Sequence, residues 1–219
     1  QGVDEADFVK TNGYNIFFVD SGVLHIMDVP EFGEIEHAST TSIQGSPVAM
    51  MLNGDNLVVV SVVSSWNIDN DDPLQDAMGW SGDWYGWRTN TLTKFTVFDI
   101  SNSSSPEINR ELYIEGYYMT AREVAGTVRT VTHTWMNIPD LRTWITYPEE
   151  YWESDYSEEE RRNMREVAAQ EAMEHNLELM SEITLEDILP QVHERIGDEI
   201  ITHHMDREDC SDFAAPEGA

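Results

Sequence analysis

The chain has 219 residues, of which 42 are acidic and 12 basic, and its formal net charge is -30 at pH 7. A surface this negative repels phosphate backbones and anionic lipids, so we expect no nucleic-acid partner. No apolar run approaches the roughly 18 residues that cross a bilayer, so we expect no membrane insertion. Cys210 is the only cysteine, which excludes an internal disulfide. The acid-rich, Lys-poor balance would suit a salty medium that screens self-repulsion.

Four short strands are predicted at the start of the chain. Residues 7–20 read as two strands around Asn12-Gly13, a dipeptide typical of two-residue hairpins. Residues 23–29 alternate in the manner of a third strand, and residues 36–44 supply a fourth. Together they predict a small antiparallel sheet.

The same order of strands and turns then restarts. A strand at 48–52 leads through the Asn53-Gly54 turn into 56–64, which is nearly all apolar and typical of a strand buried on both faces. A polar, aromatic loop spans 65–90, and 92–100 resumes the sheet. The turn at Asn53-Gly54 therefore occupies the place that the first hairpin turn held.

A third start follows at 118–124, with a turn at Ala125-Gly126 and a strand at 127–134. Once the long loop is set aside, the three starts recur at intervals of about 40 residues, which is typical of a repeat architecture. Each complete unit offers four short strands, as one propeller blade requires. The alternative is an ordinary meander or sandwich, but the repeated order of turn types favours blades.

The character of the chain changes after Pro139. Ser157 and Glu160 form a capping box that predicts a helix with apolar residues on one face, and a second helix is predicted from Thr184. Residues 149–219 hold 22 of the 42 acids. We therefore divide the chain into partial blades at 1–140, which include the aromatic loop at 65–90, an acidic helical insertion at 141–200, and a polar tail at 201–219 leading toward a next blade.

A calcium site is one candidate in the long loop. The oxygens of Asn67, Asp69 and Asp71 match the first three ligand positions of a calcium loop. Asp72 stands where that loop needs Gly, and Met78 stands where it needs Glu. A solvated acidic loop is the alternative that these departures favour, and no cofactor other than calcium is indicated.

The same loop also carries a ligand-binding candidate. Trp80, Trp84, Tyr85 and Trp87 lie among three glycines, and flat rings beside acids suit stacking on sugars or gripping a peptide. A long loop without regular hydrogen bonds also needs large side chains to bury it, so packing is the alternative role.

No motif identifies a reaction. The sequence contains no Gly-x-Ser-x-Gly elbow, no phosphate-binding Gly-rich loop with Lys, and no His-Glu-x-x-His. We therefore assign no catalytic residue.

The strand segments resemble a known family of bacterial and archaeal extracytoplasmic proteins that end in a β-propeller distantly related to WD40 repeats. The resemblance covers 7–134 well and 184–213 more weakly. The residues that carry it are Asp7–Gly13, Ile16–Val19, Leu24–Asp28, Asn53–Val58, Phe98–Ser101, Ser105–Glu107, Gly116–Met119 and Arg122.

This resemblance implies a secreted or envelope-associated protein, with this chain covering two blades and part of a third of a longer parent. We expect a mainly β partial propeller acting as a binding or scaffold module for a protein, peptide or carbohydrate. A partial propeller leaves sheet edges unpaired, so we also expect pairing between copies at those edges. The rival hypothesis is a hydrolase or metal-dependent enzyme with its site in the channel of the complete propeller.

Overall fold

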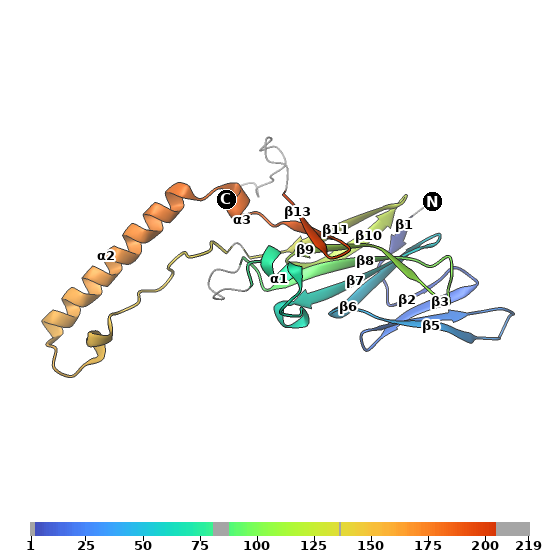
Figure 1. Cartoon of the computed structure of the whole chain (residues 1–219), viewed down its shortest axis with the longest axis horizontal. Helices are drawn as coiled ribbons and strands as arrows, with labels where there is room; N and C mark the ends of the chain where they lie inside the picture. Colours follow the sequence, from blue (N-terminus) through green and yellow to red (C-terminus); the bar gives the residue numbers. More distant parts are fainter. Residues whose placement is uncertain (1–2, 81–87, 136, 205–219) are drawn as a thin grey trace.

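The structure, a computed structural model, describes residues 3–80, 88–135 and 137–204. Its strands form three open antiparallel sheets, and one long helix projects away from them (Figure 1). Within the described residues, no helix is long and apolar enough to cross a membrane.

The first sheet, which we call blade 1, has four strands paired in chain order. They are β2 (Val9–Thr11), β3 (Asn15–Asp20), β4 (Val23–Asp28) and β5 (Glu36–Ser42). Each strand follows its neighbour through a short connection, as the hairpin signals predict.

The second sheet contains blade 2 and an extension. Blade 2 consists of β6 (Ser46–Asn53), β7 (Asn56–Ser64), β8 (Thr91–Asp99) and β9 (Glu107–Glu115). Two further strands, β12 (Val192–Ile196) and β13 (Glu199–His203), pair beyond β9 and make the sheet six-stranded. The sequence pattern did not predict this hairpin, which spans the boundary between the range expected to be helical, 141–200, and the expected polar tail, 201–219.

The third sheet, blade 3, contains the two strands of the third start. They are β10 (Tyr117–Val124) and β11 (Thr127–His133), joined by a turn in which Ala125 and Gly126 both have positive φ. The short strand β1 (Val3–Glu5) pairs with β10, so the order is β1-β10-β11.

Strand β7 of blade 2 is buried on both faces, as its nearly all-apolar sequence predicts. Leu57 and Val59 on β7 pack toward blade 1, in one cluster with Leu24 and Ile26 of β4. The alternate residues of β7 and β8, including Val58, Val60 and Phe95, face blade 3. Because successive side chains of a strand point to opposite faces, blade 2 is the central layer between the other two.

Two glycines lie where the chain passes from one blade to the next. Gly45 joins β5 to β6 with a φ of 80°, and a Cβ there would overlap the carbonyl oxygen of Val62. Gly116 joins β9 to β10 with a φ of 109°, and a Cβ there would lie 2.8 Å from the carbonyl oxygen of His133. Only glycine fits both the conformation and the close approach.

The helical elements are short except for one. The 3-10 turn η1 (Ser65–Asn67) and helix α1 (Pro73–Ala77) lie in the 65–90 loop, and η3 (Glu149–Trp152), α2 (Glu158–Glu182) and α3 (Leu185–Ile188) lie between β11 and β12.

We call residues 137–182 the arm. Its segment leading to α2 runs beside the helix, and both extend away from the sheets (Figure 1). The capping box of Ser157 and Glu160 opens α2 as predicted. Ala168 and Ala172 are buried against the leading segment, whereas Met173 and Leu177 are 49% and 63% exposed. The apolar face of α2 therefore remains largely open to solvent.

Candidate ligand-binding cleft

A cleft of about 900 Å³ opens where the arm leaves the sheets. Its walls come from segments far apart in the sequence: residues 88–90 before β8, Tyr117 at the start of β10, Thr134 and Trp135 after β11, residues 137–146 at the root of the arm, and His175 of α2. A concave site built at the junction of two parts of a molecule is a common form of binding site.

Three aromatic side chains line this cleft and remain accessible. Tyr117, Trp135 and Trp144 are 45%, 75% and 53% exposed. Trp135 also meets the ring of His133 edge-on, with the ring centroids 5.0 Å apart, so its position is partly fixed. Large flat side chains gain most by burial, and several exposed around one hollow indicate a surface prepared for a ligand.

Hydrogen bonds between the leading segment and α2 fix the arm side of the cleft. The backbone N–H of Arg142 donates to Oδ1 of Asn176, and Nδ2 of Asn176 donates to the carbonyl oxygen of Arg142, both at 2.9 Å. Nε2 of His175 lies 3.0 Å from the carbonyl oxygen of Asp140, which has a positive φ. This wall therefore depends on α2, although α2 is distant in sequence from the aromatic residues.

The sheet side of the cleft is fixed by an ion pair and a tryptophan. Nη2 of Arg88 lies 2.9 Å from a carboxylate oxygen of Glu115, whose side chain is almost fully buried. The same carboxylate accepts a hydrogen bond from the backbone N–H of Gln191. The indole N–H of Trp80 donates to the carbonyl oxygen of Thr89 at 2.7 Å. These contacts connect the end of the long loop to β9 and to the segment before β12.

The predicted aromatic loop is only partly described. Trp80 is 4% exposed and belongs to the core cluster beneath α1, so it packs inside the protein rather than facing a ligand. Trp84, Tyr85 and Trp87 lie outside the described residues. The loop returns at Arg88, which lines the cleft.

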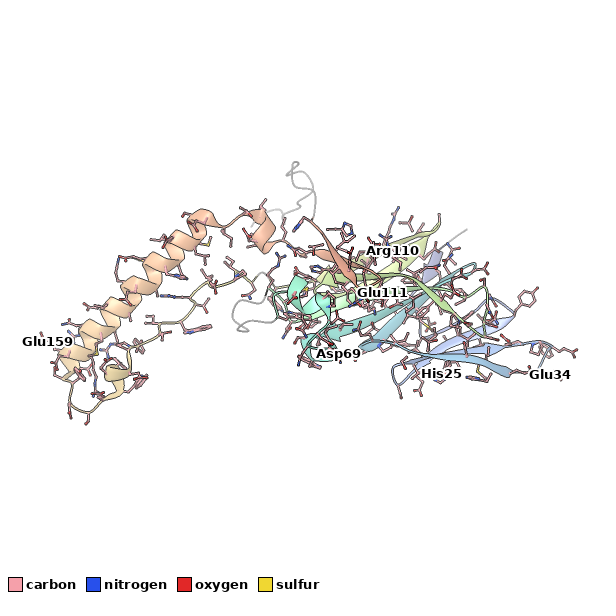
Figure 2. All side chains as sticks on the ribbon, in the orientation of Figure 1. His25, Glu34, Asp69, Arg110, Glu111 and Glu159 are labelled. Carbon is pink, nitrogen blue, oxygen red and sulfur yellow. The ribbon has the colours of Figure 1, made fainter. Side chains whose placement is uncertain are left out.

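The predicted calcium ligands have separate surroundings. Oδ1 of Asn67 accepts a hydrogen bond from the backbone N–H of Ser64, while Asp69 and Asp71 are exposed. Figure 2 places Asp69 at the surface of the 65–90 segment. The neighbouring Asp72 caps α1 and pairs with Arg195 of β12 at 2.8 Å. Across residues 3–80, 88–135 and 137–204, no three His, Cys, Asp or Glu side chains are grouped to hold a metal ion.

A row of buried polar residues crosses the face of the second sheet that looks toward blade 1. Ser61, Lys94, Tyr113 and His193 are direct cross-strand neighbours on β7, β8, β9 and β12, and all are at most 4% exposed. The ammonium of Lys94 pairs with Glu111 and donates to Oε1 of Gln44. A buried charge needs partners of this kind, so the row ties β12 to blade 2.

His193 has the most perturbed environment of this row. Burial lowers its pKa to about 4, and the positive charge of Arg88 adds to the effect. Its Nδ1 lies 2.9 Å from Oγ1 of Thr202 on β13. The imidazole is therefore neutral at pH 7 and acts as a structural contact within the β12–β13 hairpin.

Sequence reasoning missed the main members of the cleft. Trp135 and Trp144 lie in segments without regular periodicity, and Arg88, Tyr117 and His175 belong to three other elements. The enrichment of tryptophan between 66 and 152 was the one available signal. These cleft residues come together only because the arm folds back beside the sheets, and no local sequence pattern encodes that arrangement.

A family model described as "Beta propeller domain" matches residues 1–219. No curated protein and no solved structure gives a significant match to this chain. Together with the three open sheets, the match confirms the predicted fold class: mainly β, a partial propeller with a helical insertion. The WD40-like relation and the secreted origin stay predictions.

Proposed function

This chain belongs to the beta propeller domain family, and on that premise we propose that it is part of an extracytoplasmic binding module whose ligand docks in the aromatic cleft. Propeller domains in general serve as binding or scaffold platforms, but a fold alone does not assign a ligand. The observation that carries the proposal is the exposure of Tyr117, Trp135 and Trp144 around one hollow.

The chemistry of the walls suits a carbohydrate or a peptide. Aromatic faces stack on sugar rings or on peptide side chains, and Asn90, Arg88 and Thr143 bring polar groups to the same hollow. A carbohydrate uses stacking and hydroxyl hydrogen bonds together.

Arrays of glycans and of peptides, probed with the labelled full chain, test this proposal. Trp135→Ala and Trp144→Ala should each weaken binding of any positive ligand at least tenfold, because about 1.4 kcal/mol of stacking is lost. Trp66→Ala and Trp152→Ala are matched controls, since both residues are about three-quarters exposed but lie outside the cleft. Equal losses of affinity in all four variants would contradict the proposal. So would a ligand whose affinity neither cleft variant changes.

The extracytoplasmic location is tested separately. When producing cells are fractionated, an antibody raised against this chain should detect it in the medium or the cell envelope, while a cytoplasmic marker stays in the cytosol. Recovery of the chain only with the cytoplasmic marker would overturn the location without affecting the cleft.

Calcium binding at Asn67, Asp69 and Asp71 also remains a prediction. Calcium that binds only the folded chain should raise its Tm, EGTA should reverse the rise, and Asp69→Asn with Asp71→Asn should abolish it. A Tm that calcium leaves unchanged would count against the site.

A further inference from the structure

The aromatic cleft contains polar side chains that the described part of the protein does not use. Asp140, Arg142 and Thr143 line the cleft, and their side chains form no hydrogen bond or ion pair with any of the described residues. The same holds for the phenolic hydroxyl of Tyr117 on the opposite wall. Polar groups of this kind are satisfied by water in the empty cleft and can exchange that water for a ligand.

The charge of the cleft is balanced, unlike that of the whole molecule. Asp140 is the only acid among the described residues that line it, although acids make up 42 of the 219 residues of the chain. Arg88 also lines the cleft, but its charge is matched by the carboxylate of Glu115 behind it. Asp140 and Arg142 therefore leave one negative and one positive group at the same hollow.

Helix α2 holds the backbone that carries these two groups. The side-chain amide of Asn176 bonds to both the N–H and the carbonyl oxygen of Arg142, and Nε2 of His175 lies 3.0 Å from the carbonyl oxygen of Asp140. A ligand would thus meet donors and acceptors on a backbone that is already fixed, which reduces the entropy lost on binding.

This combination of groups matches the chemistry of a sugar. Each hydroxyl of a sugar both donates and accepts a hydrogen bond, and two neighbouring hydroxyls can bond to one carboxylate or one guanidinium at two points. Asp140 supplies acceptors, Arg142 supplies donors, and Thr143 supplies both. The three exposed rings of the cleft supply flat faces for the apolar side of a sugar ring. A volume of about 900 Å³ lies in the range of small-ligand sites, so it suits a short oligosaccharide.

Charged ligands fit the same walls less well. An acidic glycan is repelled by Asp140 and by the net charge of -30, while a basic peptide places its charge against Arg142. An uncharged glycan instead satisfies the carboxylate and the guanidinium together, without a net charge of its own.

We propose that the aromatic cleft binds an uncharged oligosaccharide, and that Asp140, Arg142 and Thr143 determine this specificity. The inference rests on the proposed binding function of the cleft and narrows its ligand to one class. The rings stack on the faces of the sugar units, and the three polar side chains bond to the hydroxyls. A peptide ligand is the outcome that the proposal excludes.

Calorimetric titration of the full chain with cellotriose, maltotriose, chitotriose and mannotriose tests the class. At least one should bind saturably, with the same affinity in 0.1 M and 1 M NaCl, because an uncharged ligand gains nothing that salt would screen. Trigalacturonic acid and protonated triglucosamine are the charged controls and should bind at least tenfold more weakly. Triglucosamine binding more tightly than every neutral trisaccharide would show attraction to the acidic surface instead, and would overturn the proposal.

Variants of the polar residues test their roles. Asp140→Asn removes the negative charge and keeps a residue that tolerates the φ of 60° at this position. Asp140→Asn, Arg142→Ala and Thr143→Val should each weaken the neutral glycan, the first two at least tenfold. Arg129→Ala and Asp198→Asn are matched controls, because both residues are exposed and lie outside the cleft.

The outcomes separate this inference from the proposed function. A peptide that binds and loses affinity in Trp135→Ala, with no neutral glycan bound, would overturn the carbohydrate assignment and leave the cleft as a binding site. A neutral glycan whose affinity is unchanged in Asp140→Asn and Arg142→Ala would overturn the roles of these residues. A full chain that binds neither glycans nor peptides would contradict both proposals.

Discussion

His193 shows how burial at a single position couples stability to pH. The pKa of His193 falls from its ordinary 6.5 to about 4 because the folded protein excludes water from the charged imidazole. Between these two values the unfolded chain binds more protons than the folded chain, so stability rises with pH there. The contribution is fully present above pH 6.5 and is lost as the pH falls toward 4.

We therefore expect His193 to account for up to about 3 kcal/mol of acid destabilisation between pH 6.5 and pH 4. Urea unfolding at several pH values should show a smaller pH dependence for His193→Gln than for the unmodified chain. His37→Gln is the control, because His37 is exposed on β5. Parallel pH profiles for the unmodified chain and His193→Gln would contradict this account.

Gly45 provides a second prediction for a single residue. Gly45 and Gly22 share a φ of 80°, but only at Gly45 would a Cβ meet the backbone of another strand. Gly22→Ala should cost about 1 kcal/mol from backbone strain alone. Gly45→Ala should cost about 2 kcal/mol more, because β6 must shift from β7 at the passage between blades. Chemical denaturation of the two variants measures the difference, and equal costs would refute the steric argument.

The strands and the helix cap were predictable because short-range chemistry determines them. Asn-Gly turns located the hairpins, and Ser157 with Glu160 located the start of α2. The β12–β13 hairpin was missed because its strands have only five residues each and pair with β9 across a long excursion. Its position depends on Arg195 reaching Asp72, a contact 123 residues apart in sequence that no local pattern reveals.

The cap of α2 can be tested in isolation because the arm extends away from the sheets. The backbone N–H of Glu160 donates to Oγ of Ser157, and the Glu160 carboxylate accepts from the backbone N–H of Ser157. Ser157→Ala should raise hydrogen exchange in the first turn of α2 about fivefold, equivalent to about 1 kcal/mol. The Tm of the sheets should not change. Ser154→Ala is the control, and a matching effect in that variant would contradict the role of the cap.

At the scale of the whole molecule, the net charge of -30 dominates the response to salt. Raising NaCl from 0.1 M to 1 M shortens the screening length from about 10 Å to about 3 Å, which weakens repulsion among the carboxylates. We expect the Tm to rise by about 5 °C or more. KCl should act like NaCl at equal ionic strength. A rise with only one of the two salts would indicate specific ion binding instead of screening.

Blade 2 as the central layer is the claim on which the arrangement of the three sheets rests. Methyl NOEs in a chain labelled at Ile, Leu and Val test it most directly. The account predicts NOEs from Leu24 and Ile26 to Leu57, Val59 and Ile100, which share their cluster. It predicts none to Val58, Val60 or Val97, which face blade 3. NOEs from Leu24 and Ile26 to this second group would contradict the arrangement of the blades.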